Sequence, residues 1–331
     1  MPTSSRTRRT TAVAAVLATL SALLTACGGG SSSAGDTKTI RVELFCSGLA
    51  PIAAELALNS GIAAQKGITI KPMCVTSGST ATNALIGGSA DVFMGDIGHV
   101  VLAQKRGVKM KAYGVVNDRF SYLMVSRNDP ALTSVKDLKG QKVAVTAPGT
   151  LSDTELQKAA LDAGLDPKKD LTVVSGGAGA TMQAELTGNQ VVAGMTSQPD
   201  TLQLLRTGKF KILWQQPDYR YVDIVAMADQ DWVGEHQDLM KTFLSAMSEA
   251  SQQAKANPDQ ATTWMKKQGY KISDADLKTI VTEAVKSVPD SFRPDDAVVN
   301  SSTDLLVRTG FLTKPVPAIQ DTFDYSLLPA K

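Results

Sequence analysis

The sequence predicts an α/β protein with two lobes. From Thr39 onward, short runs of β-forming residues alternate with helical segments, as in proteins built on parallel sheets. This alternation restarts near residue 142, and the chain becomes almost wholly helical after residue 228. A second series placed between the first series and a helical tail favours one lobe inserted into the other. Two lobes in simple succession remain the alternative, because periodicity does not distinguish them.

The first series begins with the strand-like run TIRVELFC (39–46). A helix is expected at 51–67, since Pro51 suits a first helical turn and Gly67 a C-terminal end. Similar patterns predict strands at 68–75, 90–95, 108–116 and 121–127, and helices at 79–88 and 99–107.

The second series shows the same alternation of short strand-like and helical runs. It predicts strands at 142–146, 170–176, 191–197 and 210–214, and helices at 151–164, 180–188 and 199–208. A further strand at 221–228 precedes the helical segment, which extends from 231 to about 308.

The N-terminus has the features of an export signal. Three arginines (Arg6, Arg8 and Arg9) precede an uncharged run at 12–26. That run is near the ~7–15 residues of a signal-peptide apolar region and short of the ~20 of a membrane-spanning helix. The following LTAC sequence resembles a bacterial lipobox. It predicts a signal peptide at 1–26 and a diacylglyceryl group on Cys27; an ordinary secretory signal with a chance cysteine is the alternative.

The segment after Cys27 is rich in glycine and serine. It lacks the apolar area that offsets ordering entropy, so residues 27–37 are expected to form a flexible tether. From Cys27 onward the chain has about 305 residues, which is enough for two lobes of ordinary size. We expect an extracytoplasmic protein that is anchored to the cell membrane by lipid.

Charge and cysteine content restrict the function. Removing the three leader arginines from the 34 basic residues leaves 31, against 32 acidic residues. A chain with this charge balance lacks the excess of basic residues that is typical of nucleic-acid-binding proteins. After lipidation only Cys46 and Cys74 remain, each at the end of a strand-like run, and an oxidising compartment makes them disulfide candidates. Two buried, unpaired thiols are the alternative.

Four segments in order carry a family likeness. They are APIAAELALNSGIAAQKGITIKP (50–72), ALIGGSADVFMGD (84–96), SVKDLKGQKVAVTAPGT (134–150) and VVAGMTSQPD (191–200). Together they resemble the extracytoplasmic solute-binding proteins of ABC importers, in the nitrate, sulfonate and taurine group that also includes proteins for thiamine precursors.

The resemblance implies the type II periplasmic-binding-protein fold, with two α/β lobes joined by two crossover segments. The crossovers would fall near 121–125 and 218–223. One lobe would then comprise 38–124 and 222–331, and the other 125–221. The implied partners are a small-molecule ligand, an ABC permease and its ATPase, and the protein would act as a monomer.

Ligands of open α/β sheets bind beyond the carboxyl ends of the strands. This rule selects the loops at 46–51, 76–80, 95–98, 146–152, 176–181 and 196–200. Several put small and hydroxyl residues just before a helix, where unpaired amides and the helix dipole can hold an anionic oxygen. Plain helix capping is the alternative for each loop. The candidate ligand residues are Phe45, Ser47, Ser77, Ser79, Thr80, Asp96, Thr146, Thr150, Ser152, Gly177, Ala178, Thr196, Asp200 and Tyr219.

Two kinds of candidate have a second interpretation. Asp96 and Asp200 either accept a hydrogen bond from a ligand amine or hydroxyl, or cap a helix. Phe45 and Tyr219 either sandwich a flat ligand part or belong to the core. No arginine falls within the selected loops, which disfavours a small anion held by guanidinium and leaves binding through amides. The identity of the ligand stays open.

Catalysis is not expected. The chain has two histidines, His99 and His236, and lacks the HExxH and GxSxG motifs that would place a metal ligand or a nucleophile. We therefore assign no catalytic residue, metal or cofactor. A pyrimidine synthase of thiamine biosynthesis, of the same structural family, would need a cysteine-rich motif. A membrane-tethered ligand sensor is the other alternative.

The lipobox predicts that Cys27→Ser abolishes lipid attachment. Because the thiol is the acceptor of the diacylglyceryl group, the variant should leave the membrane fraction or persist as uncleaved precursor. Fractionation and gel migration of the exported protein measure both effects. A variant that fractionates and migrates like the parent would contradict the lipid anchor.

Overall fold

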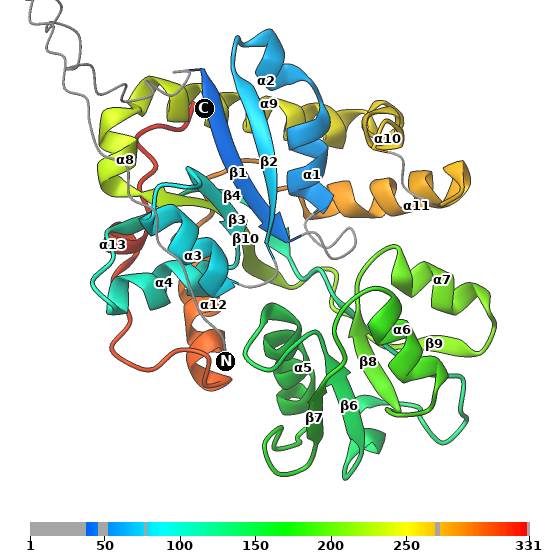
Figure 1. Cartoon of the computed structure of the whole chain (residues 1–331). Coiled ribbons are helices and arrows are strands. Elements are labelled where there is room, and N and C mark those ends of the chain that lie inside the picture. The colour runs from blue at the N-terminus through cyan, green and yellow to red at the C-terminus, as the bar shows by residue number, and fades with distance from the viewer. Residues whose placement is uncertain (1–37, 46–51, 76–77, 269–271, 330–331) are drawn as a thin grey trace, which may run out of the picture. The chain divides into compact units, whose positions relative to one another are not determined.

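The computed structural model describes residues 38–45, 52–75, 78–268 and 272–329, except the side chain of Ser79. These residues belong to one compact unit, Thr37–Lys331. The predicted signal peptide, Cys27 and the whole of the predicted tether lie outside the described residues. The unit contains two five-stranded sheets with helices on their faces (Figure 1), which confirms the predicted α/β class.

The first sheet has the strand order β2-β1-β3-β10-β4. Its strands are β1 (Thr39–Phe45), β2 (Thr69–Val75), β3 (Val92–Gly95), β4 (Met110–Arg119) and β10 (Arg220–Asp229). Strand β1 runs parallel to β2 and β3, and β10 runs antiparallel to β3 and β4. This sheet therefore takes its fifth strand from a part of the chain more than a hundred residues beyond the others.

The second sheet has the strand order β7-β6-β8-β5-β9. Its strands are β5 (Leu123–Arg127), β6 (Lys142–Val145), β7 (Thr172–Ser175), β8 (Ala193–Thr196) and β9 (Phe210–Trp214). Strand β6 runs parallel to β7 and β8, whereas β5 runs antiparallel to β8 and β9. All five strands come from the middle of the chain.

The chain passes between the two sheets twice. It leaves the first sheet at Arg119 and enters the second at Leu123, and it returns between Trp214 and Arg220. The passages are thus short, and both start or end on the neighbouring strands β4 and β10 of the first sheet. The lobe limits inferred from the resemblance (38–124 with 222–331, and 125–221) stay a prediction.

Helices cover both faces of the first sheet because its central strands are apolar on both sides. Ile40, Val42 and Leu44 face one core, which α1 (Ile52–Asn59), α2 (Ile62–Gln65) and α9 (Gln237–Ala256) complete. The opposite face packs against α3 (Gly78–Ile86), α4 (Ile97–Lys105) and α12 (Asp296–Arg308). The remaining helices on this part of the chain are α8 (Gln230–Glu235), α10 (Pro258–Lys266), α11 (Asp274–Ala284) and α13 (Ile319–Thr322).

The second sheet is covered in the same manner. Helix α5 (Leu151–Asp162) and the 3-10 turn η1 (Val135–Leu138) pack on one face. Helices α6 (Ala180–Thr187) and α7 (Asp200–Arg206) cover the other (Figure 1).

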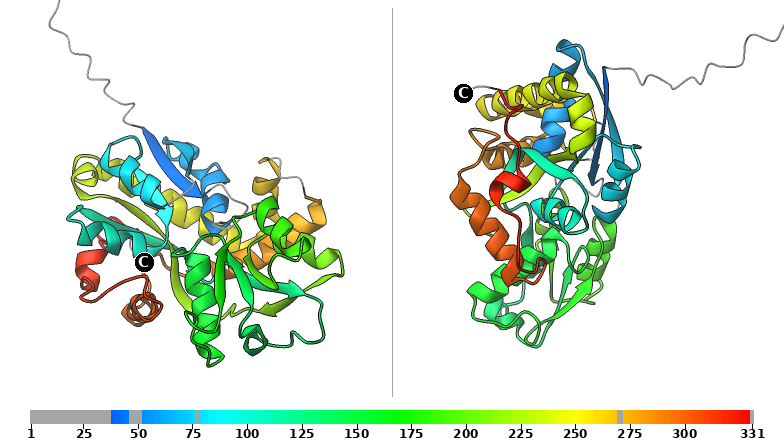
Figure 2. Two further views of the ribbon diagram at one scale, coloured as in Figure 1. Left: turned by 60° about the horizontal axis from the view of Figure 1, so that its bottom comes forward. Right: turned by 90° about the vertical axis from the view of Figure 1, so that its left-hand side faces the viewer.

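Near the C-terminus the chain returns to the first sheet. Phe323 forms an isolated parallel bridge with Ala112 of β4, and the Asp324 amide donates to the Ala112 carbonyl at 2.9 Å. Figure 2 shows this red segment lying against the part of the molecule that also contains β1.

Two helix boundaries differ from the sequence-based expectation. The helix expected at 51–67 is interrupted by Gly61, whose φ of 81° lies in the left-handed region that glycine adopts readily. The helix expected from residue 99 begins at Ile97, because the Asp96 side chain accepts the Gly98 amide and caps it there. The helical segment predicted from 231 to 308 is confirmed as α8 to α12.

Two further features bear on the leader and the cysteines. Within the described part of the chain, no helix combines the length and apolarity needed to cross a membrane. Cys74 is disulfide-bonded. It lies near the end of β2, opposite Leu44 in the parallel β1–β2 register. Its predicted partner Cys46 lies outside the described residues, so the pairing stays a prediction.

Peptide mapping tests this pairing. Mass spectrometry of the alkylated, non-reduced protein should show one linked peptide pair that contains Cys46 and Cys74. The closed loop would contribute roughly 3–4 kcal/mol in the chain-entropy model. Recovery of two alkylated thiols from protein purified from its exported location would contradict the bridge.

Candidate functional site

A cavity of about 820 Å³ lies at the strand ends of the two sheets. Its size falls within the ~300–1,000 Å³ of small-molecule sites. The first sheet's side supplies the ends of β1 and β2, the starts of α3 and α4, and Phe311 after α12. The second sheet's side supplies the segments 146–151 and 177–178. Ser121 and Tyr122 line the cavity from the first passage between the sheets.

Six of the residues selected from the sequence line this cavity. From the first sheet's side these are Phe45 and Asp96, and from the second sheet's side Thr146, Thr150, Gly177 and Ala178. The structure therefore brings together segments of the chain that are separated by as many as 133 positions, from 45 to 178. Contact with a ligand stays a prediction for each of them.

Five other selected residues lie outside the cavity lining, and four have protein neighbours that explain their position. Ser152 is buried and accepts the Thr146 amide at 3.0 Å. The hydroxyl of Thr196 lies 2.7 Å from that of Thr201. Asp200 and Tyr219 are described below, and Thr80 is exposed on α3. Ser47 and Ser77 lie outside the described residues, and Ser79 belongs to α3 without a described side chain.

Asp200 and Tyr219 are two candidate residues whose side chains contact other groups of the protein. Asp200 accepts from Gln183 Nε2 at 2.9 Å and from the Gly179 amide. The Tyr219 ring packs on Phe120 with 4.9 Å between centroids, and Lys158 Nζ lies 4.2 Å from its centre. The alternative interpretation, cap or core, therefore accounts for the position of both.

Asp96 is both a cap and a cavity residue. Its Oδ1 accepts the Gly98 amide at 2.7 Å, and its Oδ2 accepts the Tyr221 hydroxyl at 2.8 Å. Burial raises the pKa of Asp96 to about 7, although both hydrogen bonds oppose the shift. A β-carbon on Gly98 would lie 2.4 Å from Phe311, so the absence of a side chain there lets Phe311 approach the helix start.

His99 belongs to a cluster of rings beside Asp96. Its ring centroid lies 5.6 Å from Phe93, 6.3 Å from Phe311 and 6.4 Å from Phe45. A β-carbon on Gly78 would lie 2.0 Å from the imidazole, so α3 begins with a glycine against this ring. Burial lowers the pKa of His99 to about 4, which leaves the imidazole uncharged at neutral pH.

The second sheet's side carries a cluster of hydroxyls. Thr146 Oγ1 lies 3.0 Å from Thr150 Oγ1 and 2.8 Å from Ser152 Oγ. Thr150 donates to the Ala147 carbonyl at 2.7 Å. Just before α5, the Gly149 amide donates to Asp153 Oδ2 at 2.7 Å. Side chains in and just before α5 thus already occupy hydrogen-bonding groups at the start of this helix.

Carboxyl groups lie behind the cavity at the first passage between the sheets. Asp223, on β10, accepts from the Ser121 hydroxyl and from Asn117 Nδ2. Glu155, on α5, accepts the Ser121 and Tyr122 amides, each at 3.2 Å. Burial raises the pKa of Asp223 to about 8 and that of Glu155 well above its usual value, and the charge of Asp96 raises both.

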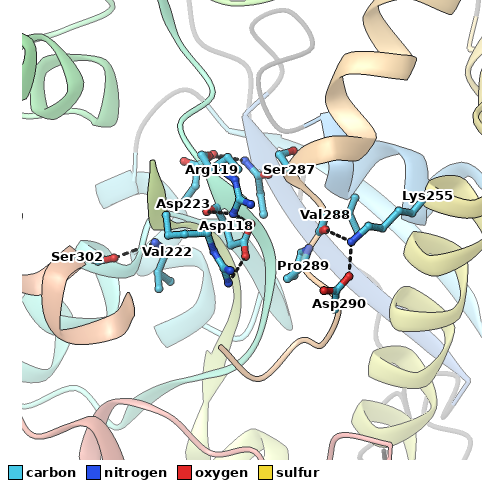
Figure 3. Close-up of polar contacts among 12 residues, drawn as sticks. Asp118, Arg119, Val222, Asp223, Lys255, Ser287, Val288, Pro289, Asp290 and Ser302 are labelled. Atoms are coloured by element: carbon cyan, nitrogen blue, oxygen red, sulfur yellow. Dashed lines mark hydrogen bonds and ion pairs between the residues drawn. The ribbon is translucent and has the colours of Figure 1, made fainter. Parts of the chain in front are cut away.

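Two arginines at the ends of β4 and β10 form ion pairs with Asp118. Asp118 accepts from Arg119 at 2.7 Å and from Arg220 at 2.6 Å. Figure 3 shows Asp118 and Arg119 near Asp223, and the Ser302 hydroxyl that accepts the Val222 amide at 2.9 Å. These contacts tie β4, β10 and α12 together where the chain leaves and re-enters the first sheet.

Sequence reasoning missed several cavity residues. His99 was not selected as a ligand residue, and no pattern singled out Phe311, Ser121 or Tyr122. Phe311 follows the helical tail, which has no strand end to mark it. Its closest signal is the Thr309–Gly310 stop of α12, where Gly310 has a φ of 76°. Among the described residues, no group of three His, Cys, Asp or Glu side chains is arranged to hold a metal ion.

Comparison with known proteins identifies the family. The NMT1/THI5-like family model matches residues 56–261, and the chain belongs to this family. No curated protein matches the sequence significantly.

Solved structures with the periplasmic-binding-protein fold resemble the chain over most of its length. The aliphatic sulphonate-binding protein SsuA from Escherichia coli is 19% identical, with a TM-score of 0.68 over 86% of this chain and 97% of its own. SsuA from Xanthomonas axonopodis pv. citri, bound to MOPS, is 16% identical, with a TM-score of 0.70 over 86% and 98%. The nitrate-binding protein NrtA from Synechocystis PCC 6803 is 16% identical, with a TM-score of 0.67 over 88% and 87%. These similarities confirm the predicted fold.

The buried carboxyls predict a pH dependence of stability. In the unfolded chain Asp223 titrates near pH ~4, whereas in the fold its pKa is about 8. The folded state therefore holds a proton that the unfolded state releases, and this stabilisation is lost as the pH rises through 8. Asp223→Asn removes the titrating group, so its melting temperature relative to the parent should rise by at least about 2 °C between pH 5 and pH 9.

The matched control for this measurement is Asp304→Asn, which alters an exposed carboxylate on α12. Differential scanning calorimetry of the three proteins at both pH values provides the comparison. A difference between Asp223→Asn and the parent that does not change with pH would contradict the assignment.

Proposed function

We propose that this protein is the membrane-anchored solute-binding component of an ABC importer. The observation that carries the proposal is the cavity, which is lined by residues of both sheets and by the first passage between them. A ligand in such a cavity contacts both halves of the molecule at once. The family and the fold support a binding protein, and capture by this particular chain is our inference.

The proposed mechanism is closure around the ligand. The chain passes between the sheets by two short segments, at 120–122 and 215–219. Two halves joined in this way sample open and closed forms, and a ligand that touches both favours the closed form. Closure would present a liganded surface to a permease.

The lipid anchor would keep the protein beside that permease. A single acyl chain binds membranes weakly, whereas the diacylglyceryl group expected on Cys27 supplies two chains. The tether at 27–37 would let the folded unit reach the transporter as a monomer. The site of action would therefore be the outer surface of the cell membrane.

Binding fits the cavity better than catalysis does. A general acid–base catalyst needs a free position near the substrate and a pKa close to the working pH. The Asp96 carboxyl is held in place by the Gly98 amide and the Tyr221 hydroxyl, so it can accept a further hydrogen bond but is not free to turn toward a reacting group. His99 is uncharged among phenylalanine rings. We therefore propose no enzymatic activity.

Two linked measurements test this function. Ligands are first identified by thermal shift across sulfonates, nitrate, taurine, and pyrimidine and flavin vitamins. For a compound that raises the melting temperature, small-angle scattering should show a smaller radius of gyration on addition. The liganded protein should also stimulate the ATPase of the permease encoded beside its gene. A bound compound that neither closes the protein nor stimulates the ATPase would contradict the proposed function.

A further inference from the structure

Three helix starts beside the cavity are already occupied by carboxylates of this chain. Asp96 accepts the Gly98 amide of α4, and Asp153 accepts the Gly149 amide just before α5. At α6, Asp200 accepts the amide of Gly179, next to the cavity residue Ala178. A helix start binds anions through free amides and its positive dipole. At these three positions an anionic ligand would meet a carboxylate instead.

The cavity offers little positive charge to compensate. Among its described lining residues the one basic side chain besides His99 is Arg106, which is exposed at the C-terminal end of α4. The His99 imidazole is uncharged at neutral pH. Behind the lining lie two further carboxyl groups, Asp223 and Glu155, whose pKa values are raised by burial and which supply no positive charge. An anion buried here would have Arg106 as its one strongly basic partner among the described lining residues.

Apart from the hydroxyls of Ser121, Thr146 and Thr150, much of the remaining lining is apolar and aromatic. Phe45, His99 and Phe311 form one wall, and Leu102, Tyr122 and Leu151 contribute further carbon surface. Such a surface favours ring compounds, because a ring that stacks on an aromatic side chain gains binding free energy beyond that from burying apolar area. A volume of about 820 Å³ also exceeds what a small inorganic ion fills.

We propose that the ligand is an uncharged or cationic ring compound that donates a hydrogen bond to Asp96, and that the cavity discriminates against sulfonates and other oxyanions. This inference rests on the binding function proposed above and specifies the chemistry of the same site. It departs from the sulfonates and nitrate in the names of the similar structures. The reason for proposing a different ligand class is that carboxylates of this chain accept the amides at three helix starts beside the cavity.

Two sets of ring compounds with matched heads test the proposal. Tryptamine, tryptophol and the corresponding indole ethanesulfonate share one skeleton, and phenethylamine, phenethyl alcohol and phenethyl sulfonate share a smaller one. Isothermal titration calorimetry of the full mature chain should give dissociation constants at least about tenfold lower for the amine and alcohol than for the sulfonate in at least one set. Tighter binding of the sulfonates, or no binding of any of the six at millimolar concentration, would overturn the ligand class.

The variant Asp96→Asn tests the named contact. Asparagine is as good a helix cap as aspartate, so the start of α4 is preserved. Loss of the carboxylate should raise the dissociation constant of the amine about tenfold and that of the alcohol less than threefold. The matched control is Asp229→Asn, which alters the cap of α8 away from the cavity and should change neither. Equal effects of Asp96→Asn on amine and alcohol would overturn the role of Asp96.

The outcomes for ligand class and for function are separable. Scattering measured with each bound compound reports closure independently of its head group. A sulfonate that binds best and closes the protein would remove the ligand class and leave the proposed function intact. An amine that binds best without closing the protein would support the ligand class and count against the proposed function.

Discussion

Ser121 lies where the chain leaves the first sheet for the second, and both halves of the molecule bind it. Its hydroxyl donates to Asp223 of β10, and its amide donates to Glu155 of α5. The arrangement of the two sheets depends on this residue, because strand β5 begins two positions later. The cavity lies directly against the same segment, so the geometry of the passage also sets the geometry of the site.

This arrangement has an electrostatic consequence. Asp96, Asp223 and Glu155 are buried in one region, while the nearby Arg119 and Arg220 are engaged by Asp118. Buried carboxyls without basic partners bind protons more tightly than they do in water. The region that joins the two halves is therefore held by hydrogen bonds to carboxyl groups whose protonation changes near neutral pH.

Much of the fold was predictable from the sequence. The alternating runs identified every strand of both sheets, since apolar β-forming segments of five to ten residues between glycines have few alternatives. Gly61 was read as part of one helix, because a single glycine does not reveal its φ. The order of strands, with β10 inserted between β3 and β4, depends on contacts between distant segments and was not predicted. The family resemblance implied only that residues 222–331 join 38–124 in one lobe.

The site was predictable to a smaller extent. The strand-end rule selected Asp96 and the loop at 146–152, because the carboxyl ends of parallel strands share one edge of a sheet. The rule did not show which amides stay free, since that depends on the individual side chains of Asp153 and Asp200. Phe311 and His99 were missed because aromatic packing between α4 and the chain after α12 leaves no local pattern.

Hydrogen–deuterium exchange tests the central claim, which is that one ligand is held by both halves across this passage. The measurement compares the mature protein with and without the compound that gives the largest thermal shift. Slower exchange should appear together at the start of α4, in the segment at 146–151 and at Ser121 and Tyr122. Protection confined to the elements of a single sheet would contradict the account.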